Sequence, residues 1–252
     1  MVQQRTSLLA LFCLAVLAGT VQAEDFRVET EVFVESNEQP VVTTLTLFRG
    51  TTVYDFMGKE AQQITIFDIN RGRIILLDSH RKVKTTVTTD QLLRFTASLK
   101  ANARGSTVDL VTAEMKESYD KQEGTLEMVG KRLKYRVNAI QPPSKEIAER
   151  YRIFADWFAR LNSMHVGNLP PFARLQLNAA LANHGLIPQS VERTVSPANR
   201  VGSSQHVRSK HLINWQLTNT DRKRISRAGD YMAKFSSVSP ANYWEQSKPA
   251  DD

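Results

Sequence analysis

Residues 64–88, ITIFDINRGRIILLDSHRKVKTTVT, decide the fold, because two apolar runs flank a short turn at Asn70-Arg71-Gly72. Glycine at the end of such a turn supplies the positive φ that a tight hairpin needs. Both faces of this hairpin are apolar: Ile64 and Ile66 oppose Phe67 and Ile69, and Ile74 and Leu76 oppose Ile75 and Leu77. A sheet that is apolar on both sides must be covered on both. We therefore expect helices, another sheet or a ligand on the second face.

Alternation with a period of two extends in both directions from this hairpin and predicts further strands. They are 26–34, 41–48, 51–57, 82–88, 125–129, 133–139, 186–195 and 207–218. Short turns join the early strands, which is typical of an antiparallel meander.

Helices are predicted between the later strands. Thr88 to Gln91 fits a capping box that opens a helix ending near Gly105, and residues 107–122 are assigned to a further helix. Ser144 is a good N-cap for the strongest helix, 144–161, and another runs from Pro170 to His184. The predicted fold class is α+β, with a mostly antiparallel sheet packed on helices.

The N-terminus reads as a secretory signal peptide. Arg5 precedes an apolar run, Leu8–Ala18, and Val21-Gln22-Ala23 follows it with small residues at a cleavage site. The run is too short for the roughly 20 residues of a membrane-spanning helix. We therefore predict cleavage after Ala23, an exported periplasmic or secreted protein, and no transmembrane helix in the mature chain. Cys13, the only cysteine, lies in the signal, so the mature chain has no disulfide framework.

The mature chain is predicted to form a single α+β domain over residues 24–235. Residues 236–252 are rich in Ser, Pro and Asp and are predicted to be a disordered tail. The formal net charge of the whole chain is +7. That excess is compatible with anionic partners, although a solvated surface slightly rich in Lys and Arg is the commoner explanation. We predict no nucleic-acid partner.

No enzyme motif is recognisable: zinc-protease, nucleophile-elbow, phosphate-loop and dinucleotide-binding patterns are missing from the sequence. No catalytic residue, metal ligand or cofactor is predicted. His206 and His211 are too few for a structural zinc site, which needs four ligands. One enzymatic alternative is a carboxylate pair, Asp68 and Asp78, that faces across the hairpin and hydrolyses an envelope glycan. The other reading is that both are ordinary strand-end aspartates.

One hypothesis is that an apolar ligand binds between sheet and helix, although close packing of protein interiors favours a filled core. The candidate pocket residues are Phe67, Leu77, Tyr151, Phe154, Trp157 and Phe158. The alternative is that these side chains simply fill the core, since interiors are close-packed. Arg222, Lys223 and Arg224 are candidates for binding an anion and are expected, with Arg227, in a loop after the strand that holds Trp215.

The layout resembles the LolA/LolB-like group of exported bacterial proteins. The resemblance covers the meander Phe26–Thr88, the helix TTDQLLRFTASL (88–99), and the late strands QSVERTV (189–195) and KHLINWQLT (210–218). It implies a curved, unclosed antiparallel sheet around helices, and carriage of acyl chains by analogy.

Together these features predict a non-enzymatic protein of the cell envelope that binds a lipid or other apolar ligand, with an envelope protein as a further possible partner. The alternatives are the glycan hydrolase and a purely structural envelope protein.

Overall fold

The computed structural model describes residues 25–58, 60–112, 114–165, 167–198 and 202–245. The predicted signal peptide, residues 1–23, and the end of the predicted tail, residues 246–252, lie outside the described residues. The strands are β1 Phe26–Val34, β2 Val42–Arg49, β3 Thr52–Met57, β4 Gln63–Asp68, β5 Arg73–Asp78, β6 Val83–Thr88, β7 Lys116–Asp120, β8 Thr125–Val129, β9 Leu133–Ile140, β10 Ile187–Val195, β11 Gln205–Asn214 and β12 Ser236–Ser237. The α-helices are α1 Thr89–Ala101, α2 Val108–Val111, α3 Lys145–Asn162, α4 Phe172–Asn183, α5 Asn219–Lys234 and α6 Pro240–Glu245, and 3-10 turns lie at Ile69–Arg71 and Gly105–Thr107.

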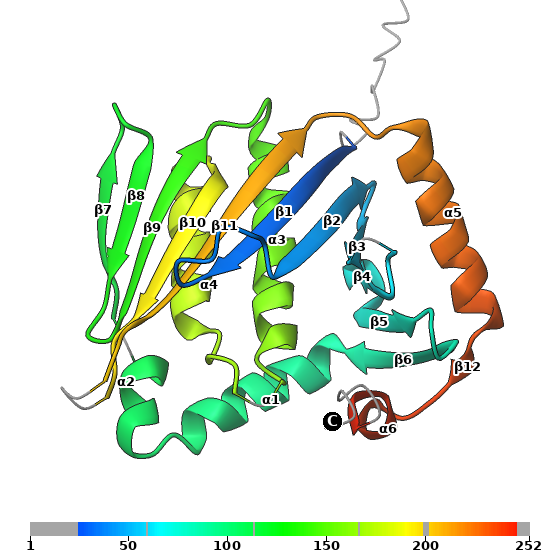
Figure 1. Cartoon of the computed structure of the whole chain (residues 1–252), viewed down its shortest axis with the longest axis horizontal. Helices are drawn as coiled ribbons and strands as arrows, with labels where there is room; N and C mark the ends of the chain where they lie inside the picture. Colours follow the sequence, from blue (N-terminus) through cyan, green and yellow to red (C-terminus); the bar gives the residue numbers. More distant parts are fainter. Residues whose placement is uncertain (1–24, 59, 113, 166, 199–201, 246–252) are drawn as a thin grey trace, which may run out of the picture.

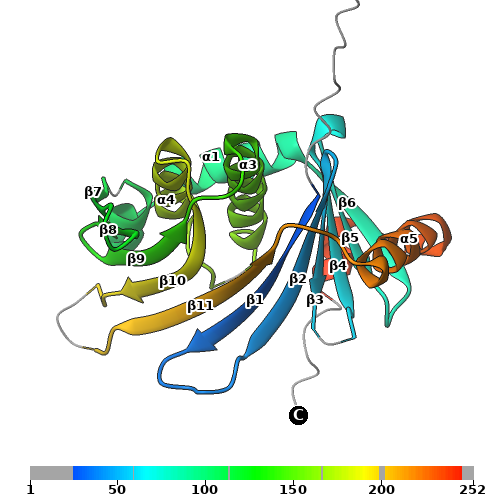
Figure 2. The same ribbon diagram turned by 90° about the horizontal axis from the view of Figure 1, so that it is seen from above.

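All twelve described strands belong to one sheet, in the order β12-β6-β5-β4-β3-β2-β1-β11-β10-β9-β8-β7. Neighbours are antiparallel except for β12, which is parallel to β6. The sheet is not closed into a barrel, and it curves so that α1, α3 and α4 lie along its concave side (Figures 1 and 2). The predicted α+β class with a curved, mostly antiparallel sheet is thus confirmed.

The hairpin of β4 and β5 has the predicted turn and the predicted two-sided burial. Gly72 ends its 3-10 turn with φ of 61°. On the concave face, Phe67 and Ile74 pack in the core that includes α3. On the opposite face, Ile66 and Ile75 pack in a separate core that includes the buried residues of α5. Figure 2 shows α5 beside β3–β6, on the side away from α3. Helices therefore cover both faces of this hairpin.

Helix α5 corrects the prediction that residues 207–218 form one strand followed by a basic loop. The strand ends at Asn214, and the helix begins at Asn219 after a capping box between Thr218 and Asp221. Asp221 is 1% exposed, and Arg27 of β1 donates to its Oδ2 at 3.0 Å. This contact fixes the start of α5 against the centre of the sheet.

Two further predictions differ from the structure. Residues 107–122 are not one helix, because Lys116–Asp120 form β7, an edge strand paired only with β8. Its side chains are mostly exposed, so the sequence carries no period-two apolar signal. The predicted disordered tail is ordered over residues 236–245, where β12 and α6 pack back on the sheet and Tyr243 is buried.

Candidate functional site

The aromatic residues proposed to line a pocket pack instead on one another. The rings of Phe67 and Phe154 are edge to face at 5.1 Å, and Phe154 lies 5.4 Å from Phe48. Tyr151 lies 6.2 Å from Phe154 within the same cluster. Centroid distances of this size are those of aromatic rings in direct contact. These side chains therefore fill the space between α3 and the sheet.

The other predicted pocket residues lie at the rim of this cluster or outside it. Trp157 is partly buried against the cluster, and Phe158 is 36% exposed with its ring 5.7 Å from that of Phe154. Leu77 is fully buried on the opposite face of the sheet, in the core under α5. Because the side chains of a strand alternate between faces, Leu77 cannot share a pocket with Phe67.

The proposed carboxylate pair does not form. In the register of β4 and β5, Asp68 lies opposite Arg73, whereas Asp78 lies opposite Gln63 at the other end of the hairpin. Five residues of strand separate the two positions, roughly 17 Å. Asp68 accepts from Arg73 at 3.0 Å, and Asp78 accepts from Arg81 at 2.8 Å. The two carboxylates hold arginines at opposite ends of the hairpin and are too far apart for glycoside hydrolysis.

A polar region occupies the concave face beyond the aromatic cluster, beneath α3 and α4. Burial lowers the pKa of Arg193 of β10 and of His211 of β11 there, and the nearby charge of Arg174 of α4 lowers both further. We call Arg174, Arg193 and His211 the inner basic site. Its residues come from three elements that are far apart in the sequence. No local sequence motif predicts it as a unit.

The two arginines of the inner basic site have no acidic partner among the residues that the structure describes. Nε of Arg174 donates to Oδ1 of Asn178 at 2.9 Å. Nε of Arg193 is buried and has no hydrogen-bond partner. Burial is the largest influence on the pKa of Arg193 and lowers it. Tyr135 opposes this shift, and the charge of Arg174, which has the smallest effect of the three, lowers the pKa further. The positive charges of Arg174 and Arg193 are thus both partly buried, and no described carboxylate pairs with either of them.

His211 does not supply the missing negative charge and adds no further positive one at neutral pH. Its Nδ1 lies 3.0 Å from Oγ1 of Thr30, and its Nε2 lies 3.0 Å from Oγ of Ser209. Burial, and then the charge of Arg174, lower its pKa to about 3. The imidazole is therefore neutral and works as a hydrogen-bonding group.

Aliphatic side chains continue the concave face next to the inner basic site. Arg193 pairs in register with Val207, Val207 with Val34, and Val32 with Val42. These four valines face the concave side, because side chains alternate between the two faces of a strand. Each of them is only partly buried. A partly exposed apolar strip thus borders two cations, which is an arrangement that suits an amphiphile with an anionic end.

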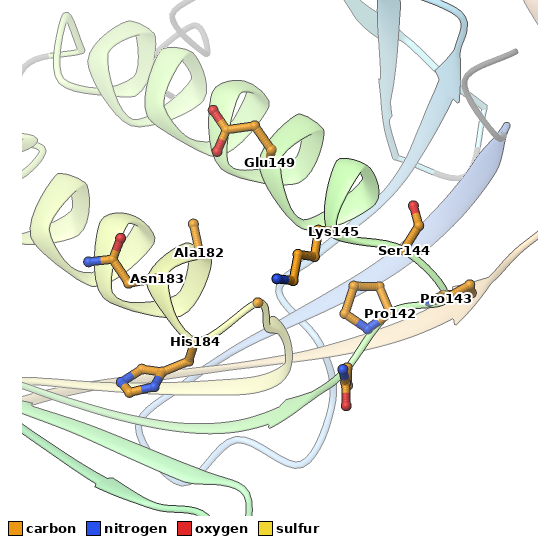
Figure 3. Close-up of a pocket in the computed structure, with 10 residues that line it drawn as sticks. Pro142, Pro143, Ser144, Lys145, Glu149, Ala182, Asn183 and His184 are labelled. Atoms are coloured by element: carbon orange, nitrogen blue, oxygen red, sulfur yellow. The ribbon is translucent and has the colours of Figure 1, made fainter. Parts of the chain in front are cut away.

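The larger of the two described hollows lies elsewhere, at the junction of β9 with α3 and the end of α4. It has a volume of about 490 Å³ and contains none of the predicted pocket residues. Lys145 and Glu149 lie on successive turns of α3, with Asn183 and His184 at the end of α4 (Figure 3). Glu149 is engaged by Arg152, and His184 Nε2 lies 2.7 Å from Oε1 of Glu117. Because Glu149 and His184 already have partners, this hollow offers less to a ligand than the inner basic site does.

The histidines considered for a metal site are separated. His206 and His211 share β11 but are five residues apart, so they face opposite sides of the sheet. Among the described residues there is no group of three or more His, Cys, Asp or Glu side chains that could hold a metal ion. None of the helices in the described ranges is long and apolar enough to cross a membrane.

A scan of protein-family models finds none that matches the sequence, and no curated protein matches it. The LolA/LolB-like resemblance, the export of the chain and its ligand therefore stay predictions.

Proposed function

We propose that this is a non-enzymatic, exported binding protein of the cell envelope whose concave sheet face holds an anionic amphiphile, such as a lipid or an acylated anion. The observation that carries the proposal is the pair Arg174 and Arg193, two partly buried guanidinium groups within each other's field and without an acidic partner among the described residues. Burying unpaired like charges is costly, and a bound anion would remove that cost.

Each part of the site has a role in this proposal. The two guanidinium groups bind the anionic end, because their planar donors match a carboxylate or a phosphate. The neutral imidazole of His211, held by Thr30 and Ser209, orients the site without adding charge. The valine strip of β1, β2 and β11 receives the apolar part of the ligand. The proposed site thus lies beside the aromatic cluster and not within it.

The test uses residues 24–252, exported and purified without detergent, and compares sodium oleate with uncharged monoolein by calorimetry. We expect oleate to bind roughly tenfold or more tightly than monoolein, since a good charge-assisted bond is worth about 1.5–3 kcal/mol. Replacing both arginines, Arg174→Met and Arg193→Met, should remove that preference. Equal affinity for the two probes in the unaltered protein would refute the proposal.

The matched control is Arg136→Met with Arg208→Met. Both residues are exposed on the opposite face of β9 and β11, so the loss of net charge is the same. The control should keep the preference for oleate. The inner variant should also be more stable than the ligand-free parent, by about 1 kcal/mol, because it removes a partly buried like-charge pair. A destabilised inner variant would mean that the arginines serve the fold.

A further inference from the structure

The second described hollow lies on the other side of the sheet, between α5 and the connection from β3 to β4. Its volume is about 170 Å³. The lining residues are Phe56, Glu60, Ala61, Ile64, Arg224, Arg227 and Tyr231. Phe56 and Ile64 are buried in the core under α5, and Tyr231 packs against that core. We call this hollow the α5 cleft.

The helical conformation of α5 separates the basic residues that are consecutive in the sequence. Arg224 and Arg227 are three residues apart, so they are neighbours on the helix surface and both border the α5 cleft. Arg222 instead approaches Asp25, with Nη1 3.8 Å from Oδ2, and Lys223 is exposed outside the cleft. Of the three residues predicted to bind an anion, only Arg224 lines the hollow, and Arg227 joins it.

Neither arginine of the α5 cleft has a hydrogen bond or an ion pair with any residue in the described part of the chain. Glu60 is the one acidic residue that lines the hollow, so two cations face one carboxylate. Arg224 is half-buried and Arg227 is exposed, and Phe56, Ile64 and Tyr231 form the apolar part of the wall. An anion held against that wall is shielded from water on one side, which strengthens its attraction to the two cations.

We propose that the α5 cleft binds a phosphate group, gripped by Arg224 and Arg227 against the apolar wall. A guanidinium group presents parallel donors that match phosphate oxygens in pairs. The volume is that of about six water molecules, at about 30 Å³ each, which admits one such group and not a whole lipid. The phosphate comes from a lipid headgroup or from a free phosphoryl compound. This site is on the opposite face of the sheet from the inner basic site and does not depend on the function proposed for it.

The experiment measures binding of inorganic phosphate by calorimetry and binding to vesicles of phosphatidylglycerol mixed with phosphatidylcholine, with pure phosphatidylcholine as reference. The cleft variant is Arg224→Ala with Arg227→Ala. Its matched control is Arg222→Ala with Lys223→Ala, which removes the same charge from the same helix outside the hollow. We expect the cleft variant to bind phosphate roughly tenfold or more weakly, and the control to lose less than about threefold.

The vesicles distinguish the two sources of phosphate. If the cleft variant alone loses binding to the anionic vesicles, the phosphate is that of a headgroup; if it loses only inorganic phosphate, the ligand is a free phosphoryl compound. Equal losses of binding in the two variants would mean that net charge alone causes the effect, and would overturn the proposal. The proposal is also overturned if the unaltered protein binds neither phosphate nor the anionic vesicles. Should the cleft variant lose its helical circular dichroism, Arg224→Lys with Arg227→Lys keeps the charge and the stems, and weaker phosphate binding by this variant is then the expected result.

Discussion

Strands β2–β6 and strands β7–β11 belong to one sheet, but the two halves bury their faces differently. In β2–β5 both faces are apolar, and α3 and α5 cover them from opposite sides. In β8–β10 the inward residues pack against α4, while the outward residues of β11, such as Arg208 and Leu212, stay exposed. The difference follows the local pattern of each strand, since a continuous apolar run needs two covers and an alternating run needs one.

The largest expected effect on stability comes from truncating a leucine on the outward face of the first half, and the matching leucine of the second half is its control. Leu77 is fully buried under α5, whereas Leu212 is 68% exposed. Leu77→Ala should lower the free energy of unfolding by about 3 kcal/mol, because it leaves a cavity. Leu212→Ala should change it by less than about 0.5 kcal/mol. Urea denaturation measures both losses, and equal losses would contradict the difference in burial between the two halves.

A smaller effect is expected where α5 is fastened to the sheet. Asp221→Ala removes the capping box with Thr218 and takes one carboxylate away from the partly buried Arg27. We expect a loss of about 2 kcal/mol in the free energy of unfolding. Asp230→Ala, at an exposed position of the same helix, is the control and should cost less than about 0.5 kcal/mol. If Asp221→Ala leaves the free energy of unfolding unchanged, apolar contacts alone hold α5 against the sheet.

The pH dependence of stability separates the two halves through one buried group in each. Burial raises the pKa of Asp55 in β3 to about 6, although a hydrogen bond from Thr46 opposes the shift. Between about pH 4 and pH 6 the folded protein therefore holds a proton that the unfolded chain loses, and stability falls as pH rises, by an amount on the order of 2 kcal/mol. Asp55→Asn stays neutral, so its stability relative to the parent should grow across this range. Urea midpoints at pH 4, 5, 6 and 7 measure the trend, and a constant difference would contradict it.

His211 in β11 gives a slope of the opposite sign. Its folded-state pKa of about 3 lies below the ordinary value, so its contribution is present at neutral pH and is lost as pH falls from about 6.5 toward 3. His211→Gln removes this contribution. The free energy of unfolding of the variant should therefore fall more steeply than that of the parent as pH rises, because only the effect of Asp55 remains. If the variant keeps the parental pH profile, the imidazole is not held neutral by the fold.

Local pattern predicted the parts of the fold that are stabilised locally. The hairpin around Gly72, the capping box of Thr88 and Gln91, and the helix after Ser144 are all present. The apolar residues on both faces of β4 and β5 also predicted a second cover. In each case neighbouring residues carry the signal, either through a turn conformation or through a period.

Helix α5 was missed although a signal for it exists. Thr218 and Asp221 have the spacing of a capping box, and Ile225, Ala228 and Tyr231 follow at helical intervals. The adjacent run of basic residues is also typical of an exposed loop, which is what the sequence predicted there. Edge strand β7 offered no comparable signal, because all of its residues except Tyr119 are exposed.

The inner basic site could not be predicted from local pattern. Arg174 and Arg193 look like ordinary residues of a helix and a strand, and only the packing of α4 across the sheet brings their charges together. The failed pairing of Asp68 with Asp78 has the same origin, because the register of the hairpin, and not the presence of two acids, sets their separation. Sites assembled from several elements depend on tertiary contacts that a single sequence does not display.

The position of β1 at the centre of the sheet has a consequence for how the chain folds. One edge of β1 pairs with β2, which follows at once, but the other pairs with β11, beginning with Arg27 opposite Asn214. During synthesis the first strand therefore waits for nearly the whole chain before its second edge is satisfied. Closing so long a loop raises the contact order and slows folding. Until then the open edge is a place where another chain can add, so the incompletely synthesised chain is exposed to aggregation through β1.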